Sequence, residues 1–186
     1  RRVAAGEAFD VVVLASDALA KLAAAGQVLA DSCVDLVHSG VAVAVREGAV
    51  PPDLSTEAAM RAAVLAAPRI SYSTGPSGVA LAALFERWGI AEQMRPRTVV
   101  PPPGVPVGSL VAQGEVALGL QQLSELIHLP GILVVGPLPA AIQITTTFSA
   151  GICATSHQAH TAATLLTYMA SADADEAKRR QGMEPA

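Results

Sequence analysis

Short apolar runs alternate with alanine-rich helical stretches along most of the chain. The first run, 9–14, is apolar except for Asp10, and a predicted helix at 19–25 follows it and ends at Gly26. Runs of this kind are typical of strands that are buried on both faces of a parallel sheet. Because strands and helices keep alternating, the pattern predicts an α/β fold with a mainly parallel sheet and right-handed crossovers.

The other predicted elements follow from the same periodicities and from their end signals. Ser55 is a suitable N-cap for a helix that runs to about residue 66, with Pro68 beyond its end, and Ser124 is a second predicted cap. The segment 34–46 is predicted to be a long bent strand that passes between lobes. Further strands are expected at 69–73, 116–121, 132–135 and 142–154, helices at 79–88, 105–112, 157–170 and 173–181, and a stiff proline-rich connection at 101–104.

Composition and charge exclude several classes of function. The chain has 186 residues, a formal net charge of -4 and only 3% aromatic residues, and its basic residues are scattered. A nucleic-acid-binding protein would need a basic surface and stacking aromatics, so no nucleic-acid partner is expected. Proline, glycine or charged residues interrupt every apolar run before it reaches the roughly 20 residues of a membrane helix, so no membrane insertion is expected.

The cysteines and histidines do not form a recognisable metal site. Cys33 and Cys153 are far apart in sequence and lie in no CxxC motif, so they are expected to be two buried free thiols or one disulfide. His157 and His160 could share a helix face, but no acid completes a ligand set. No metal and no cofactor are therefore expected.

Two polar turns are the candidate binding residues. The turn at 73–78 follows a predicted strand and precedes a helix, where free amides and the helix dipole favour an anion, and it contains no acid. A second turn, with two adjacent glutamines, follows the next buried strand. The candidates are Ser73, Thr74, Gly75, Ser77, Gly78 and Val79 in the first turn and Gln121 and Gln122 in the second. An ordinary capped turn and a surface loop are the simpler alternatives.

The sequence offers no clear catalytic group. The segment 75–79 is not a GxSxG nucleophile elbow, because its second glycine comes one position too early. Asp17 and Glu125 are predicted to be first-turn helix residues, for which a favourable interaction with the helix dipole is a sufficient role. We therefore expect a binding protein and not an enzyme.

The order of segments resembles the type II periplasmic solute-binding proteins, especially those similar to the molybdate-binding component of ABC transporters. The resemblance is carried by segments 5–13, 40–46, 73–78, 114–122 and 182–185. It implies a two-lobed fold with a first lobe at 1–41 plus 147–186, a second lobe at 42–146, and crossing strands near 36–46 and 142–154. In such proteins hydroxyls and backbone amides hold an oxyanion between the lobes, which implies contacts from Ser77, Gly78, Val79, Gln121 and Gln122.

The same resemblance implies partners and a location. The expected function is capture of a small oxyanion or other polar solute for an ABC permease, in the periplasm or another extracytoplasmic space. Residues 1–6 look like the last turn of a helix, so the first lobe is expected to be incomplete at its N-terminus, with a sheet edge that could pair with a second copy. A diverged sensory or interaction domain and an enzyme on the same scaffold are the alternatives.

Overall fold

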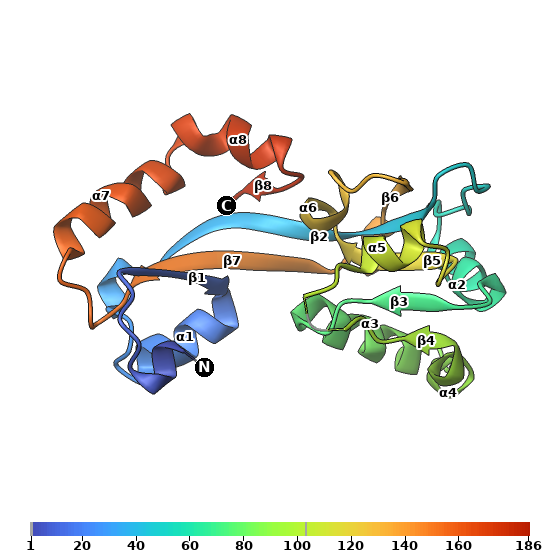
Figure 1. Cartoon of the computed structure of the whole chain (residues 1–186), viewed down its shortest axis with the longest axis horizontal. Helices are drawn as coiled ribbons and strands as arrows, with labels where there is room; N and C mark the ends of the chain where they lie inside the picture. Colours follow the sequence, from blue (N-terminus) through green and yellow to red (C-terminus); the bar gives the residue numbers. More distant parts are fainter. Residues whose placement is uncertain (1, 103) are drawn as a thin grey trace. The chain divides into compact units, whose positions relative to one another are not determined.

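The chain divides into two compact units. A computed structural model describes residues 2–102 and 104–186 (Figure 1). Unit 1 contains the residues up to Ser39 together with Thr146–Ala186, and unit 2 is Gly40–Thr145. Two long strands, β2 (Val34–Arg46) and β7 (Thr145–Ile152), contribute residues to both units.

The sheet of unit 1 is antiparallel wherever its pairs are described. Strand β1 (Val11–Ala15) pairs antiparallel with β7, and the first half of β2 pairs antiparallel with β8 (Glu184–Pro185). The residues of β1 are only partly buried, apart from the exposed Val13. The prediction that 9–14 is a strand in a parallel sheet, buried on both faces, is therefore wrong in pairing and burial, because the pattern of a single apolar run does not specify its neighbour.

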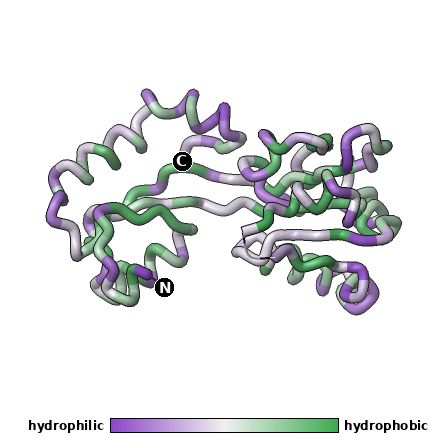
Figure 2. Tube along the Cα trace, viewed as in Figure 1, coloured by the Kyte–Doolittle hydropathy of each residue, from purple (hydrophilic) through white to green (hydrophobic). Residues whose placement is uncertain are grey.

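Helices and short 3-10 segments complete unit 1. They are η1 (Val3–Ala5), α1 (Ser16–Ala24), η2 (Ala30–Ser32), α7 (Ala159–Ala170), η5 (Ala172–Ala174) and α8 (Asp175–Arg180). Figure 2 shows hydrophobic residues along β1 and hydrophilic ones along α8. The core of the unit joins buried side chains of β2 and β7 to those of α7, namely Leu36, Val37, Ala150, Ile152, Ala162 and Leu166.

Unit 2 contains the parallel part of the fold. Strand β5 (Leu118–Gln122) pairs parallel with β3 (Ile70–Tyr72), and β3 pairs parallel with β4 (Thr98–Val99). On its other side β5 pairs antiparallel with β2, which also pairs antiparallel with β6 (Ile132–Pro137). All residues of β5 are buried, including Gln121 and Gln122, which were predicted to lie in a polar turn after the strand and instead form its last two residues. The α/β class is confirmed, and the sheet is mixed, with parallel pairs among β3, β4 and β5.

Helices cover both faces of this sheet. They are α2 (Glu57–Ala66), α3 (Pro76–Arg87), α4 (Ala91–Met94), α5 (Val107–Ala112) and α6 (Leu123–Leu126), with the 3-10 segments η3 (Arg95–Arg97) and η4 (Ala140–Ile142). Leu120 of β5 belongs to the same core cluster as Leu81 and Phe85 of α3. A Cβ on Gly119, the residue before Leu120, would meet side chains of α5. Because successive strand residues face opposite sides, α3 and α5 cover opposite faces of β5.

Several helix starts differ from the predictions. Helix α2 is capped by Thr56 and not by Ser55, since the Thr56 hydroxyl accepts the Ala59 N–H at 3.1 Å. Helix α3 starts at Pro76, before the predicted 79, because proline is favoured in the first turn. The predicted cap Ser124 instead lies inside α6, whose N-cap is Gln122 and has no side-chain cap bond.

Two predictions lie partly outside the described residues. The proline-rich connection at 101–104 includes Pro103, and the helix end at 1–6 includes Arg1.

Both cysteines are free, but only Cys153 is buried, so the predicted burial of Cys33 is wrong. Among residues 2–102 and 104–186, no helix has the length and apolarity needed to cross a membrane.

Candidate functional site

The first candidate turn connects β3 to α3 in unit 2. The Gly75 amide donates a hydrogen bond to the Ser73 hydroxyl at 3.0 Å. The amides of Gly78 and Val79 donate to the Gly75 carbonyl at 3.0 and 3.1 Å. Two of the amides predicted to face a ligand are therefore already bonded within the turn.

Gly78 makes the tightest approach in this turn. A Cβ at this position would lie 1.5 Å from the carbonyl oxygen of Ser73. No side chain fits such a space, so a residue without a Cβ is required for the start of α3 to pack against the end of β3.

Ser77 and Gln122 bind each other inside the unit. The Ser77 hydroxyl donates to Oε1 of Gln122 at 3.1 Å, and their exposed fractions are 0% and 3%. This bond ties the first turn of α3 to the carboxyl end of β5. Both side chains were predicted to contact a ligand; they bind each other instead, are buried, and line neither of the two hollows described below.

Gln121 lies on the opposite face of β5 and has both ends of its amide engaged. Its Oε1 accepts the Val107 N–H at the start of α5 at 3.0 Å, and its Nε2 donates to the carboxylate of Glu125 in α6. Burial raises the pKa of Glu125 above its usual value, and the hydrogen bond from Gln121 opposes that shift only in part. The result is a surface carboxylate that a buried amide holds in one position.

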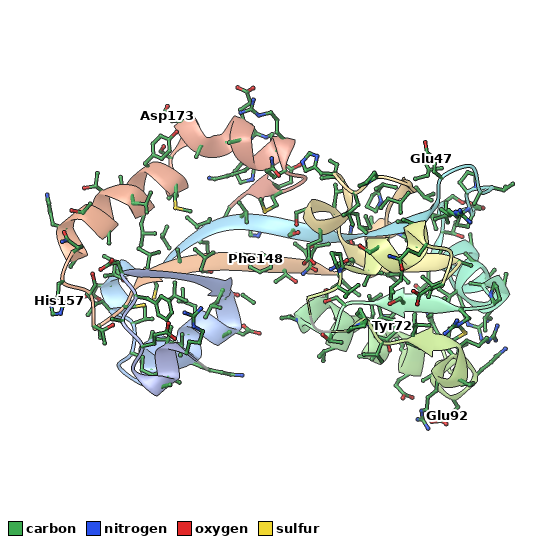
Figure 3. The ribbon with its side chains drawn as sticks, in the orientation of Figure 1. Glu47, Tyr72, Glu92, Phe148, His157 and Asp173 are labelled. Carbon is green, nitrogen blue, oxygen red and sulfur yellow. The ribbon has the colours of Figure 1, made fainter. Side chains whose placement is uncertain are left out.

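A hollow of about 230 Å³ lies beside the first turn of α3. Four predicted site residues line it, together with Tyr72, which Figure 3 labels on β3; the lining residues are Tyr72, Ser73, Thr74, Gly78, Val79, Ala82, Thr98 and Val100. Partial burial raises the pKa of the Tyr72 hydroxyl. A second hollow of about 300 Å³ shares Tyr72, Ala82, Thr98 and Val100 and adds two charged residues, Glu86 and Arg95, of which Arg95 forms a salt bridge with Glu92. Gly75, Ser77, Gln121 and Gln122 line neither of the two hollows.

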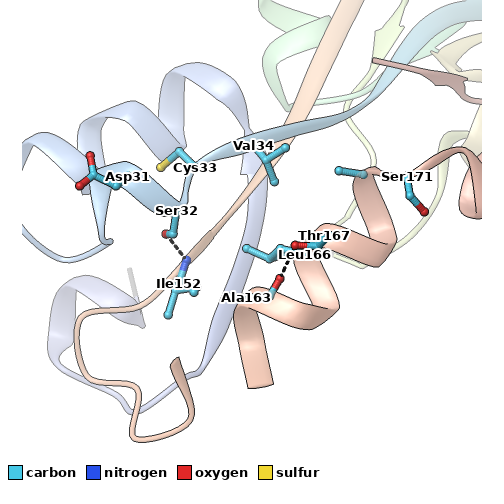
Figure 4. Close-up of a pocket in the computed structure, with 10 residues that line it drawn as sticks. Asp31, Ser32, Cys33, Val34, Ile152, Ala163, Leu166, Thr167 and Ser171 are labelled. Atoms are coloured by element: carbon cyan, nitrogen blue, oxygen red, sulfur yellow. Dashed lines mark hydrogen bonds between the residues drawn. The ribbon is translucent and has the colours of Figure 1, made fainter. Parts of the chain in front are cut away.

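Unit 1 has a hollow of its own, of about 430 Å³, beside α7 (Figure 4). Its hydroxyls are bonded to the backbone: Thr167 donates to the Ala163 carbonyl at 2.9 Å, and Ser32 accepts the Ile152 N–H at 2.8 Å. The rest of the lining is apolar side chains such as Val34, Ile152 and Leu166, together with Cys33 and the carboxylate of Asp31. A lining with an acid and no base is less suited to an anion than the turn at the start of α3.

The family follows from a comparison of the whole sequence. A family model described as bacterial extracellular solute-binding protein matches residues 1–184. The chain belongs to this family. The resemblance predicted from the segment order is thereby confirmed, and with it a role in binding small solutes.

Individual relatives differ in what their names say they do, and the two solved structures share the fold of this chain. The chain is 42% identical over 185 residues to an aconitate isomerase from a Pseudomonas species, covering 99% of this chain and 70% of the relative. The periplasmic molybdate-binding protein of Azotobacter vinelandii superposes with a TM-score of 0.78 at 19% identity, over 98% of this chain and 80% of that one. A sulfate-binding protein of Mycobacterium tuberculosis superposes with a TM-score of 0.77 at 18% identity, over 100% and 72%. These two likenesses confirm the type II periplasmic-binding-protein fold.

The prediction that the chain is not an enzyme is wrong, because the relative at 42% identity is named as an isomerase. That prediction depended on finding no acid in the candidate turns. The structure bonds the carboxylate of Glu125 in α6 to the side chain of Gln121 in β5, so an acid does contact one of the predicted site residues. The four-residue spacing between Gln121 and Glu125 could have indicated in the sequence that these two side chains meet. It was not used, because interaction with the helix dipole was taken as a sufficient role for Glu125.

Proposed function

We propose that this protein is an enzyme that isomerises aconitate or a closely similar unsaturated polycarboxylate. The observation that carries the proposal is the 42% identity to an aconitate isomerase over 99% of the chain. At that identity and coverage the relative and this chain share their fold throughout, and a shared reaction is the simplest explanation of the likeness. The activity then uses a solute-binding scaffold for chemistry.

The chemistry of aconitate defines what such a site must provide. Aconitate carries three carboxylates around one carbon–carbon double bond and has cis and trans isomers. A shift of the double bond interconverts them, and removal of a proton from the adjacent CH2 group achieves this without a cofactor. The site therefore needs groups that bind carboxylates and one group that accepts and returns a proton.

Unit 2 has side chains suited to the carboxylates. Ser73 and Thr74 contribute hydroxyls to the hollow beside the first turn of α3, where the helix dipole favours negative charge. Arg95 lines the adjoining hollow, but it pairs with the Glu92 carboxylate and Glu86 lines the same hollow, so the proposal depends on the hydroxyls and the helix start. We propose that Ser73, Thr74, Gly78 and Val79 contact the substrate, while Gly75, Ser77, Gln121 and Gln122 hold the two turns in place.

Family membership supports the remaining parts of the proposal. We propose an extracytoplasmic location, which the family match supports. We also propose that units 1 and 2 are the two lobes of the fold, which is supported by the division of the chain after Ser39 and after Thr145. Pairing of a second copy along β1, a terminal strand of the sheet order, is tested by sedimentation; a monomer at high concentration would exclude it.

Capture of a small anion for an ABC permease is the second candidate function. It is favoured by the family match over residues 1–184, since the family is described by solute binding. In this case the hydroxyls and helix start of unit 2 would bind a solute without changing it.

One experiment separates the two functions. The purified protein is incubated with each isomer of aconitate, the products are separated by chromatography, and binding of aconitate, molybdate and sulfate is measured by calorimetry. Formation of the second isomer supports the enzyme, and Thr74→Ala should then weaken aconitate binding more than Thr56→Ala, a matched control in the cap of α2. Binding of an anion without any turnover would overturn the enzyme and support capture.

A further inference from the structure

Tyr72 borders both of the hollows described beside α3. It is the last residue of β3 and comes directly before Ser73, and it lines the hollow at the first turn of α3 as well as the adjoining one. The sequence pattern assigns it no role beyond that of a strand residue. Resting on the proposed isomerase function, we infer that Tyr72 recognises the substrate, with its hydroxyl donating a hydrogen bond to one carboxylate of aconitate.

Two contacts with α3 hold the ring of Tyr72 in place. Its centroid lies 5.6 Å from that of Phe85, the two rings are nearly perpendicular at 85°, and Phe85 is only 2% exposed. A Cβ on Gly78 would lie 3.5 Å from Cδ2 of Tyr72, so the ring also lies against the first turn of the helix. An edge-to-face pair of this kind favours one orientation of the ring. The hydroxyl therefore meets a ligand from a defined position.

The hydroxyl of Tyr72 is available to a ligand. Within residues 2–102 and 104–186 no group accepts a hydrogen bond from it. Every buried side-chain oxygen in those ranges has a partner, so this oxygen is reachable from solvent. Partial burial of the side chain raises the pKa of Tyr72, so the hydroxyl keeps its proton at neutral pH and remains a donor. A carboxylate oxygen is a strong acceptor for such a donor.

Two neighbouring hydroxyls can donate to the same carboxylate. The Ser73 hydroxyl accepts the Gly75 N–H at 3.0 Å, which leaves its own proton free to donate. Thr74 lines the same hollow, and its hydroxyl has no partner in the described part of the chain. Three consecutive residues thus offer three donors, and the two oxygens of a carboxylate have room for all of them.

The charges of the two hollows favour a carboxylate beside the start of α3. The described lining of the first hollow contains no charged side chain, so an anion meets only hydroxyls and the helix dipole there. The adjoining hollow contains the acid Glu86, and its Arg95 is paired with Glu92. Because like charges repel, a carboxylate is disfavoured in the adjoining hollow. Tyr72 stands at the boundary, where its hydroxyl can bind the carboxylate that occupies the first hollow.

The test compares Tyr72→Phe, which removes only the hydroxyl, with the same change at the other tyrosine, Tyr168, which is 57% exposed on α7. We expect Tyr72→Phe to raise the KM for aconitate about 10–100-fold, because a hydrogen bond to a charged group is lost. The kcat at saturating aconitate should stay within about threefold of the wild type, because the bond is made in the bound substrate as well as in the transition state. Tyr168→Phe should behave as the wild type. A KM within about threefold of the wild type for Tyr72→Phe, or a loss confined to kcat, would overturn the inference.

A second measurement does not depend on the folding of Tyr72→Phe. Tyr168→Phe leaves Tyr72 as the single tyrosine of the sequence, so tyrosine labelled isotopically at Cζ gives one NMR signal. Aconitate should shift this signal, because Cζ carries the hydroxyl that forms the new bond, and an unshifted signal at saturating aconitate would overturn the inference.

The two levels of the proposal fail in different ways. A wild-type protein that neither binds nor converts aconitate would refute the proposed function and the role of Tyr72 with it. An active wild type whose Tyr72→Phe variant has the same KM would refute the role of Tyr72 alone.

Discussion

Replacing Gly78 by alanine tests how closely the first turn of α3 packs on the end of β3. The added Cβ would lie 1.5 Å from the Ser73 carbonyl oxygen and 2.6 Å from its carbonyl carbon. Since the closest ordinary approach of carbon to oxygen is about 3.3 Å, the helix start must move away by roughly 1.8 Å. The obstacle is backbone, so no side-chain rotation relieves the overlap.

The expected loss of stability has two sources. Forcing an extra carbon into a closely packed site costs about 1–3 kcal/mol. Moving the helix start also breaks the buried bond between Ser77 and Gln122, and a buried polar group that loses its partner costs about 1–3 kcal/mol. Together the two effects amount to about 2–6 kcal/mol, a large part of the roughly 5–15 kcal/mol by which proteins of this kind are stable.

Urea unfolding followed by circular dichroism measures the effect, with Gly75→Ala as the matched control. The Cβ at Gly75 would meet only the Ser73 hydroxyl, at 3.3 Å, and the residue has a φ of -81°, which alanine readily adopts. The control should stay within about 0.5 kcal/mol of the wild type. Equal unfolding midpoints for the Gly78→Ala variant and the control would refute the packing argument.

Three further predictions concern other parts of the chain. Because the pKa of Glu125 is raised in the folded state, its neutral form stabilises the fold below the ordinary carboxyl pKa, and this stability is lost as pH rises through the raised value. The gain in melting temperature of Glu125→Gln over the wild type should therefore grow from pH 4 to pH 8. A difference that stays constant over this range would contradict the prediction. In unit 1, Leu166→Ala should cost about 2–5 kcal/mol in urea unfolding because Leu166 is buried, whereas Leu165→Ala, at a residue 48% exposed, should cost far less; similar losses would argue against the described core. The Trp88 indole N–H donates a hydrogen bond to the Glu57 carboxylate at 2.7 Å and lowers the pKa of Glu57. Acid titration followed by Trp88 fluorescence should therefore show a transition below the ordinary carboxyl range, and Glu57→Gln should remove it. A transition that persists in the variant would mean that another group is titrating.

Much of unit 2 could be predicted from local pattern. The strand expected at 116–121 is β5 at Leu118–Gln122, and the strand expected at 69–73 is β3 at Ile70–Tyr72. Each contains buried apolar residues, Ile70 in β3 and Leu118 and Leu120 in β5, and is followed by polar residues, a pattern that favours a short buried strand. The antiparallel neighbours of β1 and β2 could not be predicted, because apolar runs of similar composition can pair in either direction.

The candidate site was only partly predictable for a related reason. Hydroxyls between a strand and a helix indicate that Ser73 and Thr74 face a hollow at the helix start, which is a local property of the chain. The roles of Gln121 and Gln122 depend on which helix covers which face of β5. Two adjacent glutamines look alike in the sequence, yet one bonds α5 and α6 and the other bonds α3.

The sequence by itself determined the α/β class, the family, most helices and strands, and the position of the turns at the ends of β3 and β5. These follow from apolar periodicity and end signals that act over a few residues. Only the tertiary structure decided that Ser77 is buried against Gln122, 45 residues away, and that Gln121 joins Val107, 14 residues away, to Glu125. Such partners meet only after the strands have chosen their neighbours and the helices their faces, and that choice depends on the packing of the whole unit.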